Sequence, residues 1–182
     1  MNTPYKSFLL KNGNILNIFH DEIPLNPRKD WDNLGHCEFF HTRYDFGDEN
    51  EFSDHEDAMN FASSKNVISL PVYMYDHSGQ TISTSPFSCR WDSGQLGYIW
   101  VTKEKIKKEY SVKRISSKLK ENVLNYLKGE IETLDQYIRG EVYRFEILEK
   151  DTENELDSCG GFFGDNFEEN GLFDHANVTK ED

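Results

Sequence analysis

The sequence has few cysteines and no long apolar run, and both absences narrow the class of protein it encodes. Its three cysteines, Cys37, Cys89 and Cys159, are odd in number and far apart, which favours a reducing cytosol over a disulfide framework. The first residues lack the basic and apolar stretches of a signal peptide. No apolar run approaches the roughly 20 residues needed to span a bilayer. We therefore expect a cytoplasmic protein.

Spacings that carry chemistry are also missing. His36, Cys37 and His41 do not fall in the paired spacing of a structural zinc site, and the clustered acidic residues do not follow the order of a calcium loop. The glycines lack the strand-to-helix context of a phosphate loop. A nucleophile built from Cys89 or Cys159 with His77 as its base is a further possibility, for which no substrate is indicated. We predict no catalytic residue, no metal site and no cofactor.

Acidic charge dominates the composition. There are 33 Asp and Glu against 20 Lys and Arg, for a formal net charge of −13. Such a field repels nucleic acid and anionic membranes and speeds encounter with basic surfaces. A dense acidic block without Lys or Arg is either a solvated loop or an interaction face. The predicted partner-binding residues are Asp45, Asp48, Glu49, Glu51, Asp54, Glu56 and Asp57 in one block and Glu153, Glu155 and Asp157 in another.

One segment has the opposite charge. Residues 103–120 contain eight basic side chains and two acidic ones, a local net charge of +6, so the rest of the chain carries −19. A solvated helix face is the simpler interpretation, because Lys is a good surface helix former. A basic stripe can also contact phosphates. The possible nucleic-acid contacts are Lys105, Lys107, Lys108, Lys113 and Arg114.

Hydrophobic patterning predicts an α+β fold: a mainly antiparallel sheet with one long helix and one or two short helices packed on it. Asn-Gly between two apolar runs predicts a hairpin over 6–21. An unbroken apolar run predicts a central strand at 97–101. Apolar positions three or four apart predict a helix over 116–139, and Thr102 is the expected N-cap of a short helix before it.

The remaining chain gives weaker patterns. Further strands are predicted near 70–79, 141–148 and 156–164. The aromatic and acidic stretch over 30–57 has no clear period, and we expect loops and short helical turns there. We predict a single domain over 1–172, followed by an acidic, frayed tail over 173–182.

Several stretches together resemble a family of small acidic phage and prophage proteins of gut Firmicutes, which includes a type II-A anti-CRISPR that inhibits Cas9. The most specific blocks are WDNLG, YDHSG and WDSGQ, and the resemblance runs over nearly the whole chain. The stretches are NPRKDWDNLGHCEFFHTRYDFGDENEFSD at 26–54, PVYMYDHSGQTISTSPFSCRWDSGQLGYIWVTKEKI at 71–106, EIETLDQYIRGEVY at 130–143 and DSCGGFFGD at 157–165.

The resemblance implies a protein of the bacterial host cytoplasm that binds Cas9 in its guide-RNA-loaded form and blocks recognition or cleavage of target DNA. It carries over no catalytic motif. The charge agrees with this function, since Cas9 holds nucleic acid in positively charged channels and clustered carboxylates can replace phosphates there. The alternative is a phage accessory protein that binds duplex DNA through residues 103–120.

Overall fold

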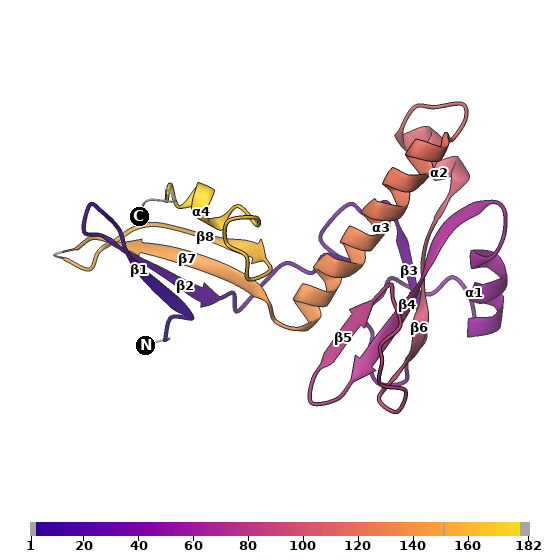
Figure 1. The fold of residues 1–182 in the computed structure, drawn as a ribbon, viewed down its shortest axis with the longest axis horizontal. Coiled ribbons are helices and arrows are strands. Elements are labelled where there is room, and N and C mark those ends of the chain that lie inside the picture. Colours follow the sequence, from indigo (N-terminus) through magenta and orange to yellow (C-terminus); the bar gives the residue numbers. More distant parts are fainter. Residues whose placement is uncertain (1–2, 151, 179–182) are drawn as a thin grey trace. The chain divides into compact units, whose positions relative to one another are not determined.

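The computed structural model describes residues 3–150 and 152–178, which form an α+β fold of two antiparallel four-stranded sheets, one long helix and short helices (Figure 1). The predicted fold class is confirmed, but the sheets are two in number because strands near the two ends pair with each other. The chain divides into two compact units, residues 1–25 with 140–182, and residues 26–139. The single domain over 1–172 stays a prediction.

The sheet of the first unit has the order β1-β2-β7-β8, with every neighbouring pair antiparallel. Its strands are β1 (Lys6–Leu9), β2 (Ile15–His20), β7 (Val142–Leu148) and β8 (Glu155–Phe163). The predicted hairpin over 6–21 is confirmed, since β1 pairs with β2. Gly13 adopts the positive φ, 85°, that the turn requires.

The core of the first unit is formed by its sheet and its C-terminal segment. Leu16, Ile18 and Phe145 are buried together with Leu172 from the short helix α4 (Leu172–His175). Phe173 in the same helix packs edge-on against a phenylalanine of β1. Residues 173–178 of the predicted frayed tail therefore include a helical turn that packs on this core. Residues 179–182 lie outside the described residues.

The sheet of the second unit has the order β3-β6-β4-β5 and is also antiparallel. Its strands are β3 (His36–Phe39), β4 (Val67–Asp76), β5 (Gln80–Ser83) and β6 (Ser93–Thr102). The predicted central strand at 97–101 is confirmed, because β6 pairs with both β3 and β4. Strand β3 falls within the stretch over 30–57 where loops were predicted. Its four residues are too few to reveal a period.

Two helices cover opposite faces of this second sheet (Figure 1). Ile99 and Val101 of β6 are buried against the helix α3 (Ser117–Ile138). Trp100, which alternates with them, packs against Phe61 of α1 (His55–Ala62), with ring centroids 4.8 Å apart. Successive residues of β6 therefore point to opposite faces of the sheet, and each face is covered by a helix. An unbroken apolar run in a central strand predicts this arrangement.

The predicted helices begin where their capping residues stand. The Ser116 hydroxyl accepts a hydrogen bond from the Leu119 amide at the start of α3, and Thr102 caps α2 (Lys103–Glu109) in the same way, both at 3.1 Å. The apolar stripe of α3 is buried on the sheet. Within the described residues, no helix is both long enough and apolar enough to cross a membrane.

Candidate functional site

Arg28 lies at the centre of a buried charge network in the second unit. Its guanidinium donates to both carboxylate oxygens of Asp48, at 3.1 and 2.5 Å, and to Glu130 at 2.8 Å. It also donates to the Gly35 carbonyl at 2.8 Å. Burial acts to lower the pKa of Arg28, but its hydrogen bonds to Asp48 and Glu130 and the charge of Asp48 act to raise it, and the net direction is upward. The network therefore holds a permanently charged arginine.

Glu38 is a further buried carboxylate, and it is fully enclosed. It lies in β3 and accepts hydrogen bonds from the backbone amides of Glu51 and Phe52, both at 3.0 Å. Asp48 accepts one from the amide of Cys37, in the same strand, at 2.8 Å. Strand β3 thus fixes the chain that follows it at two points. A backbone held by buried, charge-assisted hydrogen bonds loses little further entropy when it binds a partner.

The acidic segment, residues 45–57, contains these anchor points, and most of its carboxylates are exposed. Asp48 is committed to Arg28 and is largely buried, and Asp54 caps α1 by accepting from the Asp57 amide at 2.9 Å. These two predicted partner-binding residues therefore have structural roles. The other predicted residues of the segment expose their carboxylates to solvent: Asp45, Glu49, Glu51, Glu56 and Asp57.

The second predicted acidic block belongs to the first unit. Glu153 lies in the turn before β8, and Glu155 and Asp157 lie in that strand. All three are exposed, and Glu155 accepts a hydrogen bond from the Ser158 hydroxyl at 2.7 Å. This block and the acidic segment therefore belong to different units of the chain.

The predicted nucleic-acid contacts separate into two groups. Lys107, Lys113 and Arg114 line one hollow of the second unit. Lys105 lies elsewhere: its ammonium group donates to the Asn33 carbonyl at 2.8 Å. Lys108 lines neither that hollow nor the groove described next.

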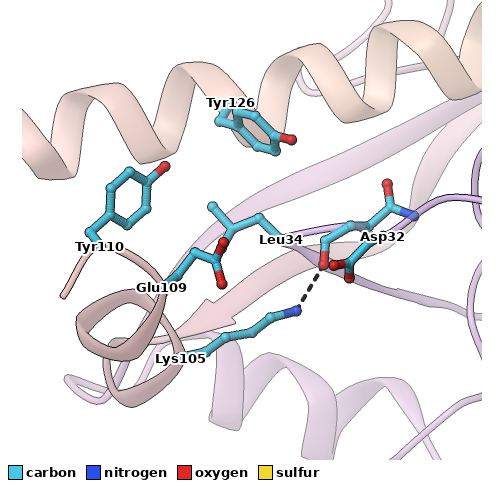
Figure 2. Close-up of a pocket in the computed structure, with 7 residues that line it drawn as sticks. Asp32, Leu34, Lys105, Glu109, Tyr110 and Tyr126 are labelled. Carbon is cyan, nitrogen blue, oxygen red and sulfur yellow. Dashed lines mark hydrogen bonds between the residues drawn. The ribbon is translucent and has the colours of Figure 1, made fainter.

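A groove lined by aromatic side chains lies beside α3. Tyr126 reaches into it from α3, Lys105 and Glu109 from α2, and Tyr110 from the residue after α2 (Figure 2). An adjoining hollow continues along α3 to Trp31. We call these two hollows the aromatic groove; their volumes are about 210 and 400 Å³. Half of Tyr126 is exposed, and exposed Tyr and Trp are the commonest anchors of protein interfaces.

The Cys89 and His77 pair does not have the geometry of an activated nucleophile. The carboxylate of Asp92 lies between them, 3.6 Å from the Cys89 sulfur and 3.4 Å from His77 Nδ1. In a nucleophile–base pair the imidazole itself contacts the thiol. The arrangement here instead lets the thiol donate to a carboxylate.

Cys37 is the buried cysteine, and burial raises the pKa of its thiol well above the ordinary value. The thiol form is therefore favoured, and a thiol is a poor nucleophile and metal ligand. Among the described residues, no three His, Cys, Asp or Glu side chains form a group that could hold a metal ion.

The residues outside the acidic segment that hold it in place were not identified from the sequence. Arg28 and Glu130 are 102 positions apart in the chain, so no local pattern links them. Glu38 did carry a signal, because a single acid inside the apolar run around Cys37 and Phe39 indicates a buried, hydrogen-bonded carboxylate. Comparisons with protein-family models, with curated proteins and with solved structures found no match.

Proposed function

We propose that this chain is an anti-CRISPR protein that binds a guide-RNA-loaded Cas9 and blocks recognition or cleavage of target DNA. The acidic segment occupies part of the positively charged nucleic-acid channel in place of phosphates. The observation that carries the proposal is a cluster in sequence of exposed carboxylates on a segment whose backbone and Asp48 side chain are held to strand β3 by hydrogen bonds. The resemblance of the sequence to the phage family supports the choice of partner and of the bacterial cytoplasm as the site of action.

The chemistry of the segment suits an arginine-rich surface. An exposed carboxylate forms a charge-assisted, often bidentate, hydrogen-bonded pair with a guanidinium. Cas9 uses such groups to hold nucleic-acid backbones and to recognise its adjacent motif. The net charge of −13 adds long-range attraction to a basic channel. Binding by this surface is therefore fast, sensitive to salt and competitive with target DNA.

The aromatic groove supplies a second kind of contact. Glu130 joins it to the acidic segment, because this residue lines the groove and also binds Arg28, which holds Asp48. Aromatic anchors that lose water on binding contribute more affinity than rim charges do. Tyr126 is suited to be such an anchor. The charges of the acidic segment are suited to speed the encounter with Cas9 and to fix the orientation in which the two proteins bind.

The proposal is tested with purified protein and guide-loaded Cas9, by following complex formation and cleavage of a matched DNA duplex. In the acid variant, Asp45→Asn, Glu49→Gln, Glu51→Gln and Glu56→Gln remove four exposed charges and leave both anchors in place. We expect it to bind Cas9 about tenfold or more weakly, since each lost charge pair contributes of order 1 kcal/mol or less at an exposed site.

The matched control removes four exposed carboxylates elsewhere: Glu104→Gln, Glu121→Gln, Glu132→Gln and Glu169→Gln. It has the same net charge as the acid variant, so it retains affinity if the acidic segment is the contact surface. Equal weakening of both variants would assign the effect to net charge alone. If the wild-type protein forms no complex with any of several Cas9 orthologues, the proposed partner is refuted.

A further inference from the structure

Five basic side chains surround one hollow of the second unit. We call it the basic hollow; its volume is about 440 Å³ and its basic residues are Lys103, Lys107, Lys113, Arg114 and Lys120. The rest of its lining consists of two isoleucines and two serines. No carboxylate lines it, in a chain that has 33 Asp and Glu.

The connection between two helices brings these residues together. Helix α2 ends at Glu109 with Tyr110 as its C-cap, and Ser111 takes a positive φ of 51° that turns the chain back. The Val112 amide then donates to the Lys107 carbonyl at 3.0 Å, which closes the end of α2. Ser116 begins α3. The last turn of α2, the connection and the first turn of α3 each contribute cations to the same hollow.

Within the part of the chain that the structure describes, these five cations have no partner of opposite charge. Among the described residues, none of them forms an ion pair with a carboxylate, whereas Arg28, Arg43 and Arg139 each have at least one such pair. Like charges gathered around one hollow repel each other, and this repulsion is relieved when an anion enters. The arrangement is therefore poised for a ligand with several negative charges.

We propose that the basic hollow binds consecutive phosphates of a nucleic-acid duplex. Five cations exceed what a single phosphate can use, which favours a polyanion with spaced charges. No aromatic residue lines the hollow, so it offers no ring on which an unpaired base could stack, as single-strand binders do. Contact with the backbone alone makes binding independent of sequence.

This site differs from the stripe that the sequence indicated. Lys103 and Lys120 belong to it, although neither was among the predicted nucleic-acid contacts, and Lys105 and Lys108 do not. The net charge of −13 limits the affinity, since the rest of the molecule repels DNA. We expect dissociation constants in the non-specific range, on the order of 10⁻⁴ to 10⁻⁶ M near physiological salt.

The test measures fluorescence anisotropy of a short labelled DNA duplex without Cas9, at several salt concentrations. In the hollow variant, Lys107→Gln, Lys113→Gln and Arg114→Gln remove three cations from the lining. The matched control carries Lys108→Gln, Lys118→Gln and Lys128→Gln, three exposed lysines outside it. We expect the hollow variant to bind the duplex at least about tenfold more weakly than wild type, while the control stays within about threefold of wild type. The slope of the logarithm of the binding constant against the logarithm of the salt concentration should become shallower by roughly three in the hollow variant.

Three results would overturn the proposal: no duplex binding by the wild type at low salt, equal weakening in the hollow variant and the control, or tighter binding of single strands than of duplex. An RNA duplex and inorganic tripolyphosphate serve as further probes. If tripolyphosphate displaces the duplex at the same concentration of phosphate groups, a duplex is not the preferred ligand, because the hollow then binds short polyphosphates equally well. Loss of duplex binding leaves the Cas9 proposal intact, because that complex is measured separately.

Discussion

Arg28 joins the acidic segment to the long helix, because its guanidinium donates to Asp48 on one side and to Glu130 of α3 on the other. Only 2% of its side chain is exposed. Glu130 in turn accepts from the backbone amides of Leu34 and Gly35, at 2.8 and 3.1 Å. One buried cation therefore fixes three stretches of chain that are distant in sequence.

The first prediction concerns this network. Arg28→Met leaves Asp48 and Glu130 without a counter-charge, and breaking a buried pair in this way costs about 3–5 kcal/mol. We expect a loss of that size in the free energy of unfolding, measured by urea denaturation. Arg43→Met is the control, because the Arg43–Asp76 pair is two-thirds exposed at the arginine and contributes less than about 1 kcal/mol. Equal losses in both variants would contradict a special role for Arg28.

The second prediction concerns alkaline pH. Burial raises the pKa of Cys37 above its unfolded value near 9, so the unfolded state loses the thiol proton first as the pH rises. Stability is therefore fully present below about pH 9 and decreases above it. Urea denaturation as a function of pH should show this decrease in the wild type and a smaller one in Cys37→Ala.

Thiol titration with a disulfide reagent should modify the native protein at Cys159 and Cys89, but at Cys37 only after unfolding. Modification of Cys37 at the native rate of Cys159 would contradict its burial.

Elements with strong local signals were predictable from the sequence. The α3 helix combines an apolar stripe with Ser116 as its cap, and its predicted range of 116–139 includes both capping residues. The hairpin over 6–21 depends on Asn-Gly, which selects its own turn type. Strand β3 was missed because it is four residues long and is stabilised by its partner β6 rather than by its own composition.

The division into two sheets was not predictable in the same way. Strand β2 pairs with β7 across more than 120 residues of chain, and local patterns do not specify such a pairing. The acidic residues of the segment were visible in the sequence. Which of them are held by structural hydrogen bonds and which are free to contact a partner depends on residues that are distant in the chain. Asp48 is held in place because Arg28 and the Cys37 amide lie within reach of its carboxylate, whereas the neighbouring Glu49 is exposed.

The third prediction contrasts two glycines. Gly129 lies within α3, and a Cβ placed there meets no atom within 4 Å. Gly129→Ala should therefore stabilise the protein by up to about 1 kcal/mol through helix propensity. Gly97 is the opposite case, because its Cβ would lie 2.0 Å from the Glu38 carbonyl oxygen in the paired strand. Gly97→Ala should cost more than about 2 kcal/mol. Thermal or urea unfolding of both variants measures the contrast, and a neutral Gly97→Ala would contradict the close strand approach.

The fourth prediction separates the two proposed binding surfaces. A protein that coats DNA also lowers Cas9 cleavage, so inhibition alone does not identify the target. When the inhibitor is mixed with the Cas9 complex before DNA is added, inhibition by binding Cas9 reaches completion at a fixed ratio of inhibitor to Cas9 complex. Inhibition by coating DNA instead requires more protein as DNA is added, and it weakens when unrelated duplex is supplied.

We therefore expect the acid and hollow variants to fail in different assays. The acid variant should lose stoichiometric inhibition of Cas9 but bind duplex DNA as well as wild type or better, because four repulsive charges are gone. The hollow variant should inhibit Cas9 at the same ratio as wild type and lose duplex binding. The measurement is a cleavage titration at two DNA concentrations, with and without unrelated duplex. If the hollow variant fails to inhibit while the acid variant inhibits normally, the reduced cleavage comes from shielding of the DNA, and the acidic segment is not the Cas9 contact.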